Sequence, residues 1–119
     1  MKYALLIYAA PGAGERSAAE ATESWLDYIR AIKESGALIA AEQLTGTDTA
    51  TSVRVRGGDR LLTDGPFMET KEHLLGFFLI DVPDLDAALD WATRMPAVNG
   101  GTVEVRAAIS GMAWQKVLD

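Results

Sequence analysis

The stretch from Asp64 to Asp81, DGPFMETKEHLLGFFLID, holds the side chains best suited to chemistry. Asp64 opens a tight Asp-Gly-Pro-Phe turn, and His73 follows it just before the most apolar run of the chain. An imidazole exchanges protons near neutral pH, and a carboxylate can act as a general base where burial raises its pKa, so Asp64 and His73 form the predicted catalytic pair. The predicted ligand-binding residues, three of them aromatic, are Tyr8, Phe67, Lys71 and Phe78.

Each of these residues also has a purely structural interpretation. The Asp64 carboxylate can hold its turn by accepting hydrogen bonds from the amides that follow. His73 can be a packed or surface residue beside a core strand. If residues 69–75 are extended, Lys71 and His73 share one face and Glu72 lies on the other. The alternative is a solvated charged stretch before a buried strand.

Composition removes several classes of function. The net charge is −6 and no Lys/Arg cluster occurs, so nucleic acid is not an expected partner. The chain has no cysteine and one histidine, so we expect no metal site, no cofactor and no disulfide. No stretch approaches the length of a membrane span. The apolar start, MKYALLIYAAPG, is interpreted as a buried strand rather than a signal peptide, and we expect a cytoplasmic protein.

Hydrophobic periodicity and turn residues predict the elements that position these side chains. Strands are predicted over residues 2–9, 37–44, 52–56, 60–63, 74–82 and 102–109. A helix is expected from a capping box at Ser17 and Glu20 to about residue 35, with Gly36 as its left-handed cap. Asp84 is the predicted cap of a second helix that ends at Pro96. The predicted buried stripe of the first helix is Trp25, Leu26, Ile29 and Ile32.

The order strand, helix, strand, hairpin, strand, helix, strand indicates one α+β domain over residues 1–119. It is the order of a ferredoxin-like split βαβ fold with an added β-hairpin. Two helices cover only one face of such a sheet. The other face should be polar if it meets water.

The inner strands lack that polar face. In residues 74–80, both alternating sets of side chains are apolar, and residues 3–8 show the same pattern. We therefore expect a homodimer in which two sheets pack face to face. The alternative is that the C-terminal tail, residues 110–119, folds across the second face, although it is short for that task.

The segments DGPF (64–67) and ETKE (69–72), with the opening MKYALLIY and the run GFFLIDVPDLDAALDWATRMP, resemble the DGPF-containing branch of the YCII-related family. The resemblance covers nearly the whole chain and implies a dimeric α+β barrel. YCII-like relatives carry a proposed His–Asp acid/base site, and Asp64 matches its aspartate. No histidine matches the first element, because His73 is the only one here. The branch also implies a regulatory partner, a sigma factor.

The sequence therefore predicts a YCII-related homodimer that binds a small molecule in the cleft between its two sheets. One alternative is a cofactor-independent lyase or isomerase that uses Asp64 and His73. Another is a regulatory partner of a sigma factor.

Overall fold

The computed structural model describes residues 1–10, 18–66, 68 and 70–119. Within them, the strands are β1 (Lys2–Ala9), β2 (Leu38–Gln43), β3 (Thr51–Arg56), β4 (Asp59–Asp64), β5 (His73–Asp81) and β6 (Thr102–Ala107). The helices are α1 (Ala18–Glu34), α2 (Leu85–Arg94) and α3 (Gln115–Leu118), with 3-10 turns η1 (Thr47–Thr49) and η2 (Pro96–Asn99).

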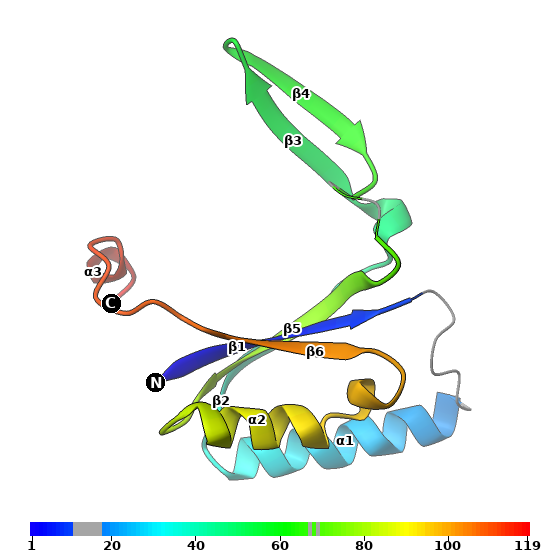
Figure 1. Cartoon of the computed structure of the whole chain (residues 1–119), viewed down its shortest axis with the longest axis vertical. Helices are drawn as coiled ribbons and strands as arrows, with labels where there is room; N and C mark the ends of the chain where they lie inside the picture. Colours follow the sequence, from blue (N-terminus) through cyan, green and yellow to red (C-terminus); the bar gives the residue numbers. More distant parts are fainter. Residues whose placement is uncertain (11–17, 67, 69) are drawn as a thin grey trace.

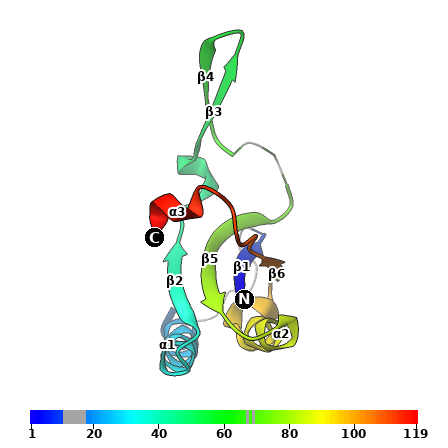
Figure 2. The ribbon, with the colours of Figure 1, turned by 90° about the vertical axis from the view of Figure 1, so that its left-hand side faces the viewer.

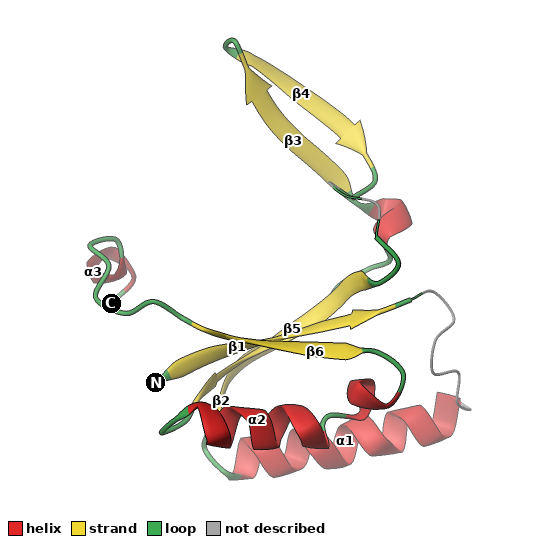
Figure 3. Cartoon of the chain, viewed as in Figure 1, coloured by secondary structure: helices red, strands yellow, loops and turns green. Residues whose placement is uncertain are grey.

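The main sheet is antiparallel and has the strand order β2-β5-β1-β6. Helices α1 and α2 lie side by side on one face of this sheet and leave the other face open (Figures 1 and 3). The two strands joined by each helix are not neighbours, which is the split βαβ arrangement. The predicted α+β fold is confirmed, and the predicted hairpin is present as a separate two-stranded sheet, β3-β4.

The predicted caps of the two helices at Gly36 and Asp84 are both present. Gly36 follows α1 with φ +81°, the left-handed conformation that favours glycine. Asp84 precedes α2, and its Oδ1 accepts a hydrogen bond from the Ala87 amide at 2.9 Å. The predicted capping box at Ser17 and Glu20 lies outside the residues whose side chains are described.

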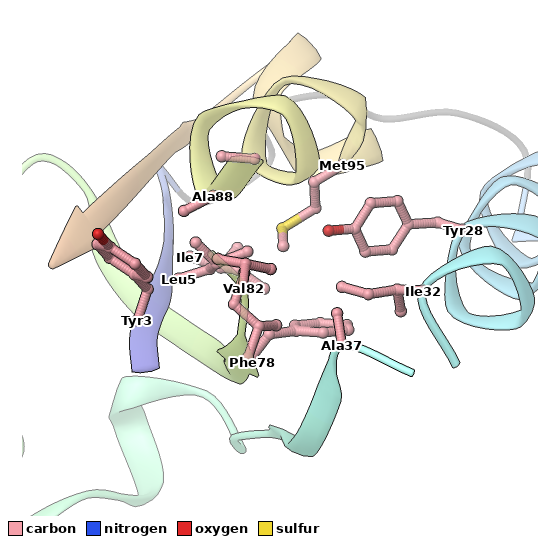
Figure 4. Packing of buried hydrophobic residues seen from close by; sticks show 12 residues of the cluster. Tyr3, Leu5, Ile7, Tyr28, Ile32, Ala37, Phe78, Val82, Ala88 and Met95 are labelled. Atoms are coloured by element: carbon pink, nitrogen blue, oxygen red, sulfur yellow. The ribbon is translucent and has the colours of Figure 1, made fainter. Parts of the chain in front are cut away.

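The core lies between the sheet and the two helices, and Figure 4 shows its packing. Aromatic rings form its centre: Phe78 stacks on Trp25 at 6.1 Å and meets Tyr28 edge-on at 5.6 Å. The predicted stripe of α1 was wrong in part, because Leu26 and Ile29 are exposed whereas Tyr28 is buried. Tyr28 carries a hydroxyl group, so it gives a weaker apolar signal than leucine or isoleucine in the sequence pattern. Small residues, Ala88 and Ala92, face the core from α2 and let this helix approach the sheet closely.

Tyr28 links the two helices through its hydroxyl, which donates a hydrogen bond to the Trp91 carbonyl oxygen at 2.8 Å. Burial raises the pKa of this phenol well above its usual value, and the nearby Arg94 opposes the shift only in part. The neutral phenol is thus favoured in the folded state. Its contribution to stability is complete below the pKa of an unfolded tyrosine, about 10, and is lost as the pH rises above it.

We expect Tyr28→Phe to lower the free energy of unfolding by about 1 kcal/mol at pH 7, since a part-buried hydrogen bond to the Trp91 carbonyl is lost. An unfolded tyrosine titrates between about pH 9 and pH 11. Over this range, the free energy of unfolding of the variant should fall less than that of the wild type. Urea denaturation across this range measures both effects. Tyr3→Phe is the control, because its hydroxyl contacts the weak Met1 sulfur acceptor at 3.7 Å. Parallel alkaline profiles for wild type and Tyr28→Phe would contradict the assignment.

The hairpin β3-β4 projects from the open side of the main sheet, and we call it the arm (Figures 1 and 2). Its tip turns through Gly57 and Gly58, which have φ of +60° and +85°, as the predicted glycine turn requires. At its root, the Gly65 amide donates to the Ala50 carbonyl at 2.7 Å. The Ser52 hydroxyl donates to the Gly65 carbonyl at 2.9 Å.

The C-terminal tail follows β6 and ends in α3, on the open side and near the N-terminus (Figure 2). With the sheet it lines a cavity of about 610 Å³ that includes Lys2, Leu79 and Trp114. Leu79 of β5 lines this cavity from the open face of the sheet. Val117 and Leu118 at the chain end remain exposed. The tail thus covers one end of the open face and leaves the rest of that face uncovered.

Candidate functional site

Polar side chains gather at the end of the sheet where β1 ends and where β5 and β6 begin. Tyr8 of β1 pairs with Leu74 on one side and with Thr102 on the other, and Ala9 pairs with His73. These strands are far apart in sequence, so the sheet order brings their polar residues together. We call this region the polar end of the sheet; its side chains with hydrogen-bonding groups are Tyr8, Glu72, His73 and Thr102.

Glu72 joins the polar end through β6. The Thr102 hydroxyl donates to Glu72 Oε1 at 3.2 Å, and the Thr70 hydroxyl donates to the Glu72 backbone carbonyl. Because Thr102 pairs with Tyr8, it lies on the same open face as Tyr8. Glu72 was interpreted from the sequence as pointing away from the site. No local signal could have found it, because its partner Thr102 is distant in the chain.

His73 is half-buried, and its hydrogen-bond partner comes from the β2 side of the sheet rather than from β6. Its Nδ1 lies 3.1 Å from the Thr47 hydroxyl, which comes from η1 just beyond β2. Side chains alternate along a strand, so His73 is directed away from the face that carries Tyr8 and Leu74. The structure therefore separates two predicted site residues, Tyr8 and His73, onto different sides of the sheet.

Thr47→Val tests whether this hydroxyl orients the His73 ring. Loss of the hydrogen bond should lower the free energy of unfolding by about 1 kcal/mol. It should also change the ring nitrogen shifts of His73, because Nδ1 loses its partner. Nitrogen-15 NMR reads this directly, since the chain has one histidine. Thr45→Val, which removes a nearby hydroxyl paired with Thr49 at 2.6 Å, is the control. Unchanged His73 nitrogen shifts in Thr47→Val would refute the orientation.

Asp64 and Lys71 both carry exposed side chains. Asp64 is the last residue of β4, at the root of the arm, where it pairs with Thr51. In the described part of the chain, no hydrogen bond or ion pair joins Asp64 to His73. The Gly65–Pro66 bond is trans. Residues 71 and 72 form a bend and β5 starts at His73, so the condition of an extended segment is not met at residues 71 and 72.

Of the two predicted aromatic walls after the turn, Phe67 lies outside the described residues. Phe78 is buried and stacks on Trp25 of α1. Its ring also meets Tyr28 on the helical side (Figure 4). Its expected place in a sheet-to-sheet cleft is therefore wrong. Its neighbour Phe77 pairs with Leu6 and Glu42 on the open face. The sequence shows which residues of β5 alternate, but both sets are apolar, so the choice of face had no local signal.

A second hollow lies on the helical side, between α1 and the β2 edge of the sheet. It is a cavity of about 550 Å³ with a mostly apolar lining that includes Trp25, Leu26, Ile29 and Phe78. Among the described residues, no group of three or more His, Cys, Asp or Glu side chains could hold a metal ion. None of the described helices is long and apolar enough to cross a membrane.

Comparison with known proteins identifies the family of this chain. Residues 1–110 match the YCII-related domain. The chain belongs to the YCII-related family. This YCII-related chain is also 38% identical, over 112 residues, to the uncharacterized protein R00369 of Rhizobium meliloti (strain 1021). That alignment covers 89% of the chain and 90% of the relative. The relative's description assigns it no activity.

Proposed function

We propose that the chain forms a homodimer through the open face of its main sheet and binds a small molecule in the cleft between the two sheets. The observation that carries this proposal is the apolar stripe along the centre of the open face. Four half-buried side chains from the two inner strands form it: Leu6, Tyr8, Phe77 and Leu79. Charged residues flank the stripe on the outer strands, Glu42 on β2, and Glu104 and Arg106 on β6.

This pattern is typical of an interface with an apolar centre and a polar rim. An antiparallel sheet with one face in water normally carries polar residues on that face. A second copy supplies an identical stripe, so the contact is self-complementary about a twofold axis. The tail covers only the Leu79 end, which leaves the rest of the stripe for the partner.

The polar end of the sheet suggests the ligand. Tyr8 and Phe77 would supply aromatic walls, and the Glu72 carboxylate beside Thr102 would accept hydrogen bonds from the ligand. A hydroxylated aromatic compound matches both properties, because its ring stacks on the walls and its hydroxyl donates to the carboxylate. Lys71, exposed just before β5, would attract an acidic group on the same compound.

Sedimentation equilibrium and native mass spectrometry test the two halves of the proposal. We expect a dimer at micromolar concentration, and a mass increment in freshly purified protein that disappears after unfolding and refolding. A monomer at all concentrations contradicts the dimer. A dimer that binds no member of a panel of hydroxylated aromatic and keto-acid compounds contradicts the ligand assignment alone.

A second candidate is acid/base catalysis by Asp64 and His73, as in a lyase or isomerase. It is favoured by the anchored ring of His73, because Thr47 occupies Nδ1 and leaves Nε2 for proton transfer. Turnover of the same panel should then fall in both Asp64→Ala and His73→Ala. Full activity in either variant rules out the pair.

Membership of the DGPF-containing branch and partnership with a sigma factor remain predictions from the resemblance. Repeated purification of the tagged chain from native lysate without any sigma factor would contradict the partnership.

A further inference from the structure

Within the described residues, the arm extends away from the main sheet and packs on none of its strands (Figure 1). Its strands β3 and β4 pair only with each other among the described strands. Apart from the partly covered Ser52, every residue from Thr51 to Asp64 is exposed. A lone two-stranded hairpin is marginally stable in water, and it usually needs a further packing surface. The exposed apolar side chains of the arm therefore favour a further packing surface beyond the described residues of its own chain.

The register of the hairpin gives the arm one apolar face and one polar face. Val53 pairs with Leu62, and Val55 pairs with Arg60, so these four side chains share a face. Val53, Val55 and Leu62 are 61%, 60% and 56% exposed. The opposite face carries Arg54 and Arg56, with Leu61 as its apolar residue. We call the first set the Val53–Leu62 face.

We propose that the Val53–Leu62 face of the arm packs on the flank of the second copy in the dimer. This inference rests on the proposed dimer and adds a second contact to it. The arm rises on the open side of the sheet, where the partner would lie (Figures 1 and 2). Packed sheets are about 10 Å apart, whereas a six-residue strand spans about 20 Å. The arm thus extends past the plane of the partner's sheet and runs along its side.

Charge favours a second copy as the occupant. The arm carries three arginines and two aspartates, whereas the whole chain has a net charge of −6. The body is therefore acidic, and a slightly basic arm is attracted to the body of another copy. Arg60 lies on the same face as the valines, at the outer end of the arm, where it would meet the acidic body of the partner. In addition, the open face and the arm lie on the same side of the chain, so one partner can cover both.

Photo-crosslinking from single cysteines tests the contact directly, because the chain has no native cysteine. Leu62→Cys and Leu61→Cys place a benzophenone maleimide on opposite faces of the arm at adjacent positions. We expect covalent dimers from Leu62→Cys in clear excess over Leu61→Cys, with the crosslink mapping to the partner's flank. Equal yields, or crosslinks within one chain, would overturn the inference.

Sedimentation equilibrium supplies the second measurement. Leu62→Asp should raise the dimer Kd about a hundredfold, because a carboxylate would be buried twice in each dimer. Leu61→Asp should change Kd by less than about threefold, since its face meets water. Circular dichroism confirms that both variants keep the fold. A dimeric wild type with equal Kd values for both variants overturns the arm contact and leaves the proposed dimer standing. A monomeric wild type overturns both the arm contact and the dimer. In the crosslinking experiment, capture of an unrelated protein by Leu62→Cys instead of a second copy overturns the assignment of the partner.

Discussion

Phe77→Asp is expected to convert the dimer into monomers at micromolar concentration. Phe77 lies at the centre of the open face, between Leu6 of β1 and Glu42 of β2. A buried phenylalanine contributes about 2 kcal/mol to association, and a twofold dimer contains it twice. The loss of about 4 kcal/mol corresponds to a Kd raised about a thousandfold, before the cost of burying the carboxylate. Sedimentation equilibrium over a wide concentration range measures this shift.

Leu89→Asp is the matched control for this variant. Leu89 is an exposed apolar residue of α2, on the layer opposite the open face. Its replacement should leave Kd unchanged within about threefold. Thermal denaturation separates dissociation from unfolding, because Phe77 lies outside the buried core cluster. If Phe77→Asp associates as tightly as Leu89→Asp, the open face is not the interface.

Gly101→Ala is expected to lower the free energy of unfolding by about 3 kcal/mol, which is the upper range for a forced overlap in a packed region. A Cβ at residue 101 would overlap the Tyr8 carbonyl oxygen and would lie 3.2 Å from the Ala97 carbonyl oxygen. Both obstacles are backbone atoms, so neither can rotate away. The strain falls on the end of β1, which carries Tyr8. Urea denaturation measures the loss, and ligand binding at the polar end should weaken with it.

Gly46→Ala provides the comparison. A Cβ there would meet the Asp48 carboxylate oxygen at 2.6 Å, which is the far end of a flexible and exposed side chain. Rotation of Asp48 relieves the contact, so we expect a loss below about 0.5 kcal/mol. Equal losses in the two variants would show that the close approach of β1 to residue 101 is not rigid.

The sequence predicts the fold because its strongest signals are local. Periodic apolar residues, the Gly57-Gly58 turn and the Asp84 cap each depend on a few adjacent residues. The structure confirms these elements to within a few residues. The open apolar face was also predictable in outline, since both alternating sets of β5 side chains are apolar.

The candidate site was less predictable because it depends on contacts between distant strands. The pair of Glu72 and Thr102 arises from the neighbouring positions of β1, β5 and β6, which no short motif encodes. The assignment of Phe78 to the cleft failed for a related reason. Both alternating sets of β5 side chains are apolar, and only the pairing of Phe78 with Leu5 of the distant strand β1 assigns Phe78 to the core face.

The strand order has a consequence for how the chain folds during synthesis. β1 and β2 are the first strands to leave the ribosome, yet each pairs with β5 and not with the other. The Met1 amino nitrogen contacts the Asp81 carboxylate at 3.1 Å, so this contact also requires the end of β5. No part of the main sheet can close before residues 73–81 have been translated, and such nonlocal pairing slows folding. Until then, β1 is exposed as an unpaired apolar strand, and only local elements such as α1 and the β3-β4 hairpin can form.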